Sequence, residues 1–411
     1  MGLAAGCDGC VRPRAGVSYL WSLDMNFQMN RRTLLTASSG MLFLKPETVR
    51  GSQANSAISV GLVGCGRRGL FDADVFVKTG QVKLTAVCDI YEDQIARAKQ
   101  LFPSAQGYGR YQDLLDADLD AVILATPPYQ RPEQFELASA ARKHIYMEKP
   151  VAVDGAGCRR MIAAAKKADA GKRISVGFQQ RYGKDYRRAC DIVKSGQMGR
   201  IEMIRGSWMS GDLPLRKGHP PAEEKIRNWV WYRETSGDIA VEQDCHNFDV
   251  VNWFMGAHPD RVTWYGGRRR RTYGDILDHL TLSFEFGNGV HFSYSANQLS
   301  TRGFRDVGET FVCEKGAIHT SRQGYRWFNK VVDETPLDKG YRTPALEEEP
   351  EEVRTEYDIT EDAASCFVEG LRGGRMENAV FAAVETMYTA IMARQAIYTG
   401  KEVTWAEVQR M

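Results

Sequence analysis

A glycine-rich loop that follows an apolar, strand-length run is the feature that most constrains the fold of this chain. Residues 58–63 (ISVGLV) form the run, and residues 64–69 (GCGRRG) follow it directly. In this order Gly64 permits a tight turn, Gly66 lets the backbone approach a pyrophosphate, and Gly69 lets the next helix pack closely on its strand. The pattern predicts a strand–turn–helix unit with a phosphate group at the helix N-terminus.

A second apolar run and an acidic residue make this interpretation more specific. Residues 82–88 lead into Asp89, which lies 20 residues after Gly69. A carboxylate at this position accepts hydrogen bonds from ribose hydroxyls and repels a 2′-phosphate, so it predicts NAD rather than NADP. The alternative is that Asp89 caps a helix that begins near Tyr91.

Strand and helix patterns continue to alternate beyond Asp89. Helices are expected over 92–101 and 132–142, and strands over 121–125 and 144–147. This alternation predicts an α/β fold with a doubly wound parallel sheet of the Rossmann type.

Two loops follow successive strands of this sheet. Thr126 and Pro127 come after the first strand, and Glu148, Lys149 and Pro150 come after the second. Ligands of doubly wound sheets bind beyond the carboxyl ends of the strands. We therefore expect both loops to face the nicotinamide half of a dinucleotide.

The second half of the chain has a different pattern. Helical spacing occurs over 181–194, 238–254, 362–371 and 379–398. Strand-like runs occur over 201–208, 261–265, 279–286, 290–296 and 310–312, and the Gly-Asn-Gly at 287–289 predicts a hairpin turn. These runs predict a C-terminal α/β domain with a mostly meandering, mainly antiparallel sheet. We expect a leader over 1–57, a dinucleotide-binding domain over 58–178 and a second domain over 179–411.

Several segments together resemble the Gfo/Idh/MocA family, which includes relatives of glucose-fructose oxidoreductase and inositol dehydrogenase. They are GCGRRG, Asp89, ATPP at 125–128, MEKPVAVD at 147–154 and SVGFQQRY at 175–182. The resemblance covers residues 58–411. It implies a nicotinamide-dependent oxidoreductase that acts on a small carbohydrate, a sugar or cyclitol. It also implies that the open sheet supports substrate binding and joins copies into a homodimer or homotetramer.

The resemblance also implies residues for the cofactor and the reaction. The implied cofactor contacts are Gly64, Gly66, Arg67, Arg68, Gly69, Asp89, Thr126, Pro127, Glu148 and Lys149. Oxidation of an alcohol by NAD needs a titratable side chain at the hydroxyl, because a proton leaves oxygen as hydride leaves carbon. In the family the lysine at the position of Lys149 bonds the reacting oxygen. The alternative is a surface lysine after a strand.

A second proton carrier is expected within residues 237–249. Glu242 and His246 are four residues apart, which places them on one face of a helix. The resemblance implies that His246 is the general base, and that the acid orients it or binds a sugar hydroxyl. Glu242 stands where the family has aspartate, so its carboxylate is displaced by one methylene. Asp249 shares the face and would hold the imidazole tautomer or contact substrate, whereas the alternative for His246 is a structural histidine.

Further residues bear on the substrate and on metal binding. Arg181 and Tyr182 match family positions that line the substrate cleft. The His, Glu and Asp residues around His246 suggest a metal site as an alternative. Their spacing is not HExxH and hydride transfer needs no metal, so no metal is expected.

The composition narrows the range of partners. Lys plus Arg total 54 and Asp plus Glu total 52, a net charge of +2. This balance lacks the basic excess with which proteins usually bind nucleic acid, so no nucleic acid partner is expected. No run approaches about 18 uninterrupted apolar residues, so a stable membrane span is not expected. The nine cysteines are scattered, without the dense spacing of a disulfide framework.

The first 57 residues have the pattern of a targeting segment. Residues 30–35 (NRRTLL) precede a short apolar stretch and resemble a twin-arginine export signal, with a cleavage point near Ser52 and Ala54. Such a signal exports a folded protein, so we expect a periplasmic or extracytoplasmic enzyme that retains its NAD tightly. If the paired arginines are a chance occurrence, the protein is cytoplasmic.

Two other functions remain open from the sequence. One is an NAD-dependent glycoside hydrolase or lyase, in which a ring carbon is oxidised transiently and the hydride then returns. The other is a sugar-sensing regulatory protein on the same scaffold.

Overall fold

The computed structural model describes residues 57–300, 303–329 and 349–411. The expected leader, with its twin-arginine motif at residues 30–35 and the cleavage point near Ser52 and Ala54, lies outside these residues apart from Ala57.

Six strands form a parallel sheet in the order β3-β2-β1-β4-β5-β6. They are β1 (Ile58–Val63), β2 (Val82–Cys88), β3 (Gln106–Tyr108), β4 (Ala121–Leu124), β5 (His144–Met147) and β6 (Ile174–Val176). Helices cover both faces of such a sheet, which explains why β1 and β4 are continuous apolar runs. The strand order reverses between β1 and β4, and this opens a crevice at their carboxyl ends. The predicted doubly wound sheet is confirmed.

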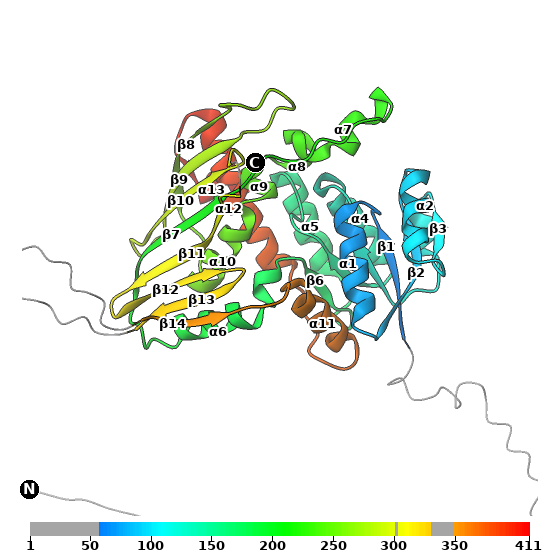
Figure 1. Ribbon diagram of the computed structural model, residues 1–411, viewed down its shortest axis with the longest axis horizontal. Helices are drawn as coiled ribbons and strands as arrows, with labels where there is room; N and C mark the ends of the chain where they lie inside the picture. The colour runs from blue at the N-terminus through cyan, green and yellow to red at the C-terminus, as the bar shows by residue number, and fades with distance from the viewer. Residues whose placement is uncertain (1–56, 301–302, 330–348) are drawn as a thin grey trace, which may run out of the picture. The chain divides into compact units, whose positions relative to one another are not determined.

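The helices of this half enclose two apolar cores. They are α1 (Arg67–Lys78), α2 (Glu92–Leu101), α3 (Tyr111–Leu115), α4 (Arg131–Ala140) and α5 (Gly155–Lys167). Helix α4 packs against α5, and α1 packs against α11 (Thr360–Leu371) from the far end of the chain (Figure 1). Phe76 of α1, Tyr146 of β5 and Phe367 of α11 meet edge to face, with ring centroids 4.9, 5.7 and 5.9 Å apart. This aromatic contact joins the C-terminal segment to the dinucleotide-binding half.

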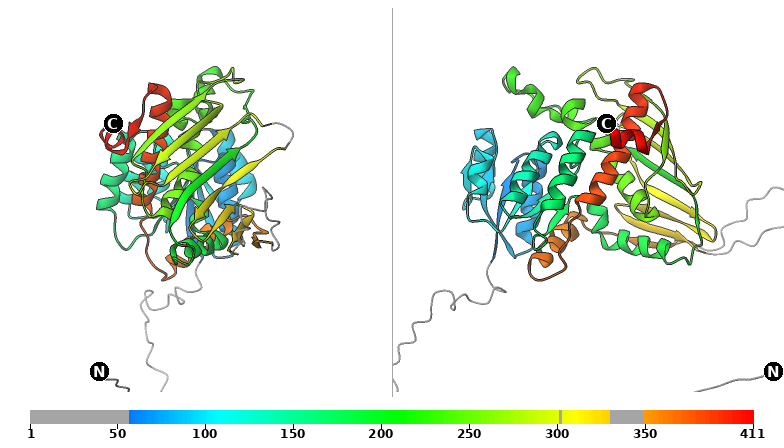
Figure 2. Two further views of the ribbon diagram at one scale, coloured as in Figure 1. Left: turned by 90° about the vertical axis from the view of Figure 1, so that its left-hand side faces the viewer. Right: turned by 180° about the vertical axis from the view of Figure 1, so that it is seen from behind.

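Nine strands form the second sheet, in the order β14-β13-β12-β11-β7-β10-β9-β8-β15 (Figure 2). They are β7 (Ile201–Met209), β8 (Arg261–Gly267), β9 (His279–Glu285), β10 (His291–Asn297), β11 (Asp306–Cys313), β12 (Gly316–Ser321), β13 (Gly324–Phe328), β14 (Glu351–Arg354) and β15 (Val403–Thr404). The β7–β10 pair is parallel and the other pairs are antiparallel. The predicted mainly antiparallel sheet is therefore confirmed. It is not a simple meander, because β7, its first strand in sequence, lies between β10 and β11.

Helices α6 (Lys184–Lys194), α10 (Cys245–Met255) and α12 (Val380–Thr399) pack against this second sheet. The helix expected over 181–194 starts later, since Arg181 lies in a short 3₁₀ turn, η3 (Gln179–Arg181). None of the helices in the described part of the chain is long and apolar enough to cross a membrane.

The helix expected over 238–254 is interrupted. Helix α9 (Ile239–Glu242) and α10 are separated by Gln243 and Asp244. The Asp244 N–H donates to the Ile239 carbonyl at 3.0 Å, five residues back, so the turn is wider than an α-helical turn. Glu242 and His246 therefore belong to different helices, and the single shared face expected from their spacing is wrong.

Candidate active site

The glycine loop lies against the end of β4. Gly64 has a φ of +92°, and a β-carbon there would lie 2.8 Å from the backbone nitrogen of Thr126. A β-carbon on Gly69 would lie 2.0 Å from the Gly64 carbonyl oxygen, so α1 could not approach its strand. Gly66 is open, because a β-carbon there would come no closer than 3.9 Å to its neighbour, an Arg216 nitrogen.

The N-terminus of α1 suits an anion. Gly66 occupies its N-cap position, no side chain caps it, and its first turn has no acidic residue. The free N–H groups and the helix dipole at such an end favour a phosphate group. Together with the open side of Gly66, this geometry fits the pyrophosphate of a dinucleotide. Arg67 is exposed at the first helical position.

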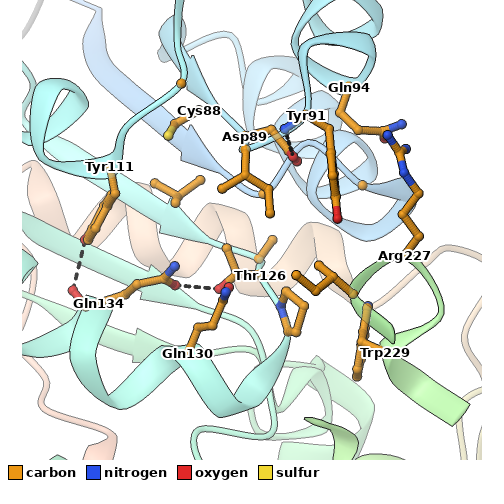
Figure 3. A pocket seen from close by; sticks show the side chains of 18 of the residues that line it. Cys88, Asp89, Tyr91, Gln94, Tyr111, Thr126, Gln130, Gln134, Arg227 and Trp229 are labelled. Atoms are coloured by element: carbon orange, nitrogen blue, oxygen red, sulfur yellow. Dashed lines mark hydrogen bonds between the residues drawn. The ribbon is translucent and has the colours of Figure 1, made fainter. Parts of the chain in front are cut away.

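A cavity lies beside the loop at the ends of β1, β2 and β4 (Figure 3). Asp89 lines it, and its carboxylate accepts hydrogen bonds from the backbone N–H groups of Cys65 at 2.9 Å and Tyr91 at 3.0 Å. Burial raises the pKa of Asp89, although both hydrogen bonds act in the opposite direction. Helix α2 has Tyr91 at its N-cap and no side-chain cap. Asp89 is thus fixed at the cavity wall, where the ribose of a dinucleotide would lie, and the helix-cap alternative is wrong.

A segment from the second half of the chain forms the opposite wall of this cavity. It includes α7 (Glu224–Arg227) and η5 (Trp229–Trp231). The Arg227 guanidinium lies 3.9 Å from the ring centroid of Tyr91 (Figure 3). It also donates two hydrogen bonds to Asp93, at 2.9 and 2.7 Å. Trp229 lines the cavity beyond it. We name the Arg227 contacts with Tyr91 and Asp93 the clasp.

We expect Arg227→Ala to raise the dissociation constant of NAD about tenfold, because it removes a cation–π contact and a bidentate ion pair that hold the cavity wall. Isothermal titration of NAD into the two proteins measures the change. The control is Arg200→Ala, an exposed arginine at the start of β7, with a side chain 81% accessible. Equal affinities in the wild type and Arg227→Ala would show that the clasp does not hold cofactor.

At the end of β5, Glu148 is buried and accepts hydrogen bonds from Arg68 Nε at 3.1 Å and Nη2 at 2.9 Å. Arg68 also forms an ion pair with Asp72 at 3.0 Å. A β-carbon on Gly177 would lie 2.5 Å from Glu148 Oε1, so the glycine makes room for this carboxylate. Arg68, expected to bind cofactor, is instead engaged by two acids because it points along α1 towards β5.

Arg131 is a residue that the sequence patterns did not single out. It is 3% exposed, and its guanidinium donates to the carbonyls of Pro150 and Thr126, the latter at 2.6 Å. Burial lowers its pKa to about 10. The two loops expected to face the nicotinamide are thus tied together by one buried cation. Arg131 is the first residue of α4, and no sequence pattern marks that position as part of a functional site.

Lys149 lies between the two halves of the chain. Its Nζ donates to the Glu242 backbone carbonyl at 2.6 Å and to Glu242 Oε1 at 3.0 Å. The side chains of Lys149 and Glu242 are 12% and 20% accessible. An ammonium has three N–H groups, so one remains for a ligand. The structure therefore brings two of the predicted catalytic residues into direct contact.

His246, the third predicted catalytic residue, is 4% exposed on the first turn of α10. Its Nδ1 lies 3.2 Å from Gln180 Oε1, and its ring stacks on Trp208 with centroids 5.4 Å apart. With an amide oxygen as acceptor, Nδ1 carries the proton and Nε2 is left as the acceptor nitrogen. Burial lowers the pKa of His246 well below its usual value, and the positive charges of Lys149, Arg322 and Arg68 lower it further. His246 is therefore a neutral base near neutral pH.

The three remaining predicted substrate residues are engaged in other contacts or buried in the core. Asp249 accepts hydrogen bonds from Arg181 at 2.7 and 2.9 Å and from Thr386 at 2.8 Å, so it does not hold His246. Gln180 does so instead, although it lies in the SVGFQQRY segment and was not singled out. Arg181 is occupied by Asp249, and Tyr182 is buried in the core between the parallel sheet and α11. Both residues precede α6, since Arg181 ends the η3 turn and Tyr182 follows it.

Two buried acids lie beneath α10. Burial raises the pKa of Asp244 to about 8 and that of Glu309 to about 7. Asn247 donates to Glu309 Oε1 at 2.6 Å and accepts from the Tyr294 hydroxyl at 3.2 Å. The network supports the helix that carries His246.

The raised pKa values of these two acids predict that the protein becomes less stable as pH rises. Their usual pKa values are 3.8 and 4.5, so from about pH 5 upward the folded state binds more protons, and the free energy of unfolding falls until the folded carboxyls ionise. We expect a lower melting temperature at about pH 9 than at about pH 6, and a smaller difference in Asp244→Asn. Differential scanning calorimetry measures both, with the partly exposed Asp74→Asn as control. If the melting temperature of Asp244→Asn falls between these two pH values as much as that of the wild type, this assignment is contradicted.

Within the described residues, no group of three or more His, Cys, Asp or Glu side chains is arranged to hold a metal ion.

Two family models match the chain. The model described as "Oxidoreductase family, NAD-binding Rossmann fold" matches residues 58–178, and the "GFO/IDH/MocA C-terminal domain" matches residues 186–319.

Individual relatives agree with these matches. The myo-inositol 2-dehydrogenase of Thermotoga maritima is 26% identical over 204 residues, which cover 49% of this chain and 56% of that protein, little more than half its length. The inositol 2-dehydrogenase of Corynebacterium glutamicum (strain R) is 26% identical over 291 residues, 68% of this chain and 81% of that protein. The solved structure of levoglucosan dehydrogenase with NADH and levoglucosan has a TM-score of 0.71 at 17% identity, covering 85% of this chain and 99% of that one.

Proposed function

The chain belongs to the Gfo/Idh/MocA family of NAD-binding oxidoreductases, and from this premise we propose that it oxidises a CH–OH group of a sugar or cyclitol. The observation that carries the proposal is the placement of Lys149, Glu242 and a neutral His246 at the junction of the two halves. Lys149 lies at the carboxyl edge of the parallel sheet, the edge on which the glycine loop also lies. Bound NAD supplies the hydride acceptor.

Each of these side chains has a distinct part in the proposed reaction. The free N–H of Lys149 donates to the substrate oxygen and stabilises the negative charge that develops on it. His246 Nε2 accepts the hydroxyl proton, and Gln180 keeps the tautomer that makes this possible. Glu242 holds the Lys149 ammonium in place. In the reverse direction the same imidazole returns the proton.

A panel of polyols tests the proposed function. The purified full-length protein is mixed with NAD and separately with myo-inositol, levoglucosan, glucose and glucuronate, and NADH absorbance is followed. We expect NADH to form with at least one class of substrate. Failure to bind NAD would overturn the proposal. Release of phenol from an aryl glycoside without NADH accumulation would replace it with the redox-neutral hydrolase or lyase.

We propose NAD as the cofactor in preference to NADP. Asp89 supports this choice, because its half-buried carboxylate lines the cavity and would repel a 2′-phosphate. Tight retention is supported by the clasp, which crosses the cavity from the second half of the chain. Mass spectrometry of gently purified protein tests retention, and fluorescence titration with each cofactor tests the preference.

We propose that the protein is exported in its folded state. The support is the NRRTLL sequence at residues 30–35. Sequencing the N-terminus of a C-terminally tagged protein from the periplasm tests it, and a cytoplasmic protein with an intact N-terminus would overturn it.

We also propose a homodimer or homotetramer built on the outer face of the nine-stranded sheet. That face exposes Met203, Tyr265 and Val312, which are 47%, 80% and 40% accessible. Light scattering of the purified protein distinguishes these states from a monomer.

A further inference from the structure

A second cavity is lined by Trp208, the residue whose ring stacks on His246. It has a volume of about 640 Å³, within the range of small-molecule sites. Its walls come from β7, the start of β11, the turn between β12 and β13, and residues 355–359, which lead into α11 (Figure 1). The Thr355 N–H donates to the Gln323 carbonyl at 2.9 Å and ties the last two walls together.

Arg322, at the β12–β13 turn, is the principal cation of this cavity. It is half-buried, its Nη2 donates to Gln179 Oε1 at 3.1 Å, and its guanidinium lies 5.6 Å from the ring centroid of Trp208. Its Nε is buried and has no hydrogen-bond partner. A partly buried guanidinium without a full set of partners is costly, and an anion would relieve that cost.

Arg322 differs in this respect from the other cations near His246. Lys149 forms an ion pair with Glu242, and Arg68 forms ion pairs with Glu148 and Asp72. In the described part of the chain no carboxylate lies within ion-pair distance of Arg322. Of these three cations, Arg322 is therefore the one that forms no ion pair with a described carboxylate, although the charge of Asp358 acts on it from a distance.

The cavity connects to the reacting groups through Trp208. The same indole stacks on His246 and contacts Arg322, while Arg322 contributes to the positive field that lowers the pKa of His246. Arg322 is therefore linked to the general base through one shared indole, and a ligand group held by Arg322 would lie on the cavity side of Trp208.

Two acids at the cavity rim limit the charge of its ligand. Asp358 and Glu356 are exposed, and Asp358 accepts a hydrogen bond from the Thr360 N–H at 2.9 Å at the start of α11. Their charges oppose those of Arg322 and of exposed Arg305. A singly charged, planar group suits this balance better than a phosphate dianion.

We propose that this cavity binds a carboxylate of the substrate through Arg322, so that the substrate is a sugar acid, a uronate or an aldonate. The inference rests on the proposed oxidation of a polyol at His246 and Lys149. Arginine pairs with carboxylates through parallel N–H groups, which gives both charge neutralisation and orientation. The carboxylate would anchor the sugar acid while a ring or chain hydroxyl reaches Lys149.

Binding to the NAD-loaded protein tests the subsite without requiring turnover. Glucuronate, galacturonate and gluconate are titrated beside glucose, myo-inositol and glucose 6-phosphate, with tryptophan fluorescence and calorimetry as readouts. We expect at least one acid to bind at least tenfold more tightly than glucose. Arg322→Gln should remove that preference, and Arg322→Lys should restore part of it. Arg326→Gln, an exposed arginine on β13, is the control, and NAD affinity and melting temperature report folding.

Distinct outcomes separate the two proposals. A wild type that prefers no acid over glucose, an Arg322→Gln variant that keeps the preference, or tighter binding of glucose 6-phosphate than of any acid would each overturn the carboxylate subsite. Binding of an acid that depends on Arg322 but yields no NADH would support the subsite and contradict the proposed oxidation. Oxidation of neutral polyols that is unchanged in Arg322→Gln would support the oxidation and overturn the subsite.

Discussion

Replacing Lys149 with methionine should lower kcat about a thousandfold and change the NAD dissociation constant by less than about threefold. Methionine keeps the unbranched apolar stem and removes the ammonium that would bond the substrate oxygen. Glu242 loses its partner, but it is 20% accessible and can be hydrated. The main loss is therefore at the reacting oxygen rather than in folding. Stopped-flow measurement of NADH formation with the best substrate of the panel gives the rate.

Two controls make this result specific. Lys83→Met changes an exposed lysine on β2 and should leave kcat within about twofold of the wild type. Calorimetric NAD binding shows whether the Lys149→Met protein retains its cofactor site. A Lys149→Met enzyme with wild-type turnover would remove this lysine from the mechanism, and so would a loss confined to KM.

Arg131→Leu should lower the free energy of unfolding by about 3 kcal/mol and abolish most activity. Leucine fills part of the volume but leaves the Thr126 and Pro150 carbonyls without their charged donor. It also removes the positive charge that acts on Glu148, Glu242 and Asp72. The loops after β4 and β5 would then lose their fixed separation, and with it the position of Lys149. Urea denaturation and steady-state kinetics measure the two effects.

The matched control is Arg160→Leu, on α5 of the same half. Arg160 pairs with Glu136 at 2.6 Å, but its side chain is 49% accessible, so the loss should be at most about 1 kcal/mol. If Arg131→Leu is no less stable than Arg160→Leu, the buried arginine does not hold the two loops together.

Local sequence patterns were sufficient to predict the parallel sheet and the positions of the glycine loop and Asp89 in it. The buried strands are short, continuous apolar runs, and the glycine spacing is dictated by close backbone contacts such as that between Gly69 and Gly64. Asp89 was predicted because the loop and the next strand fix its position relative to the ribose. These features depend on residues close in sequence or on a repeating βα unit, so the spacing of residues along the chain is enough to predict them.

The long-range partners of the site could not be predicted in this way. Arg227, Arg131, Gln180 and Arg322 are common polar residues in segments without distinctive spacing. Their roles follow from contacts with Tyr91, Pro150, His246 and Trp208, which lie 19 or more residues away in the sequence. The helical spacing of Glu242, His246 and Asp249 gave a wrong arrangement, since one wide turn at Asp244 separates two helices and Asp249 is already engaged by Arg181.

The sequence by itself predicted the glycine loop, Asp89 beside it, and the order of strands and helices, and it marked Lys149 as the amine proposed to act on substrate. Apolar periodicity and turn chemistry act over a few residues, so they can be read without the fold. Only the tertiary structure decided which charges are neutralised. Arg68 is paired with Glu148 and Asp72, and Lys149 is paired with Glu242, whereas Arg322 lies beside Trp208 and forms no ion pair within the described part of the chain. Charge pairing depends on distance and burial in space, and packing between remote segments sets both.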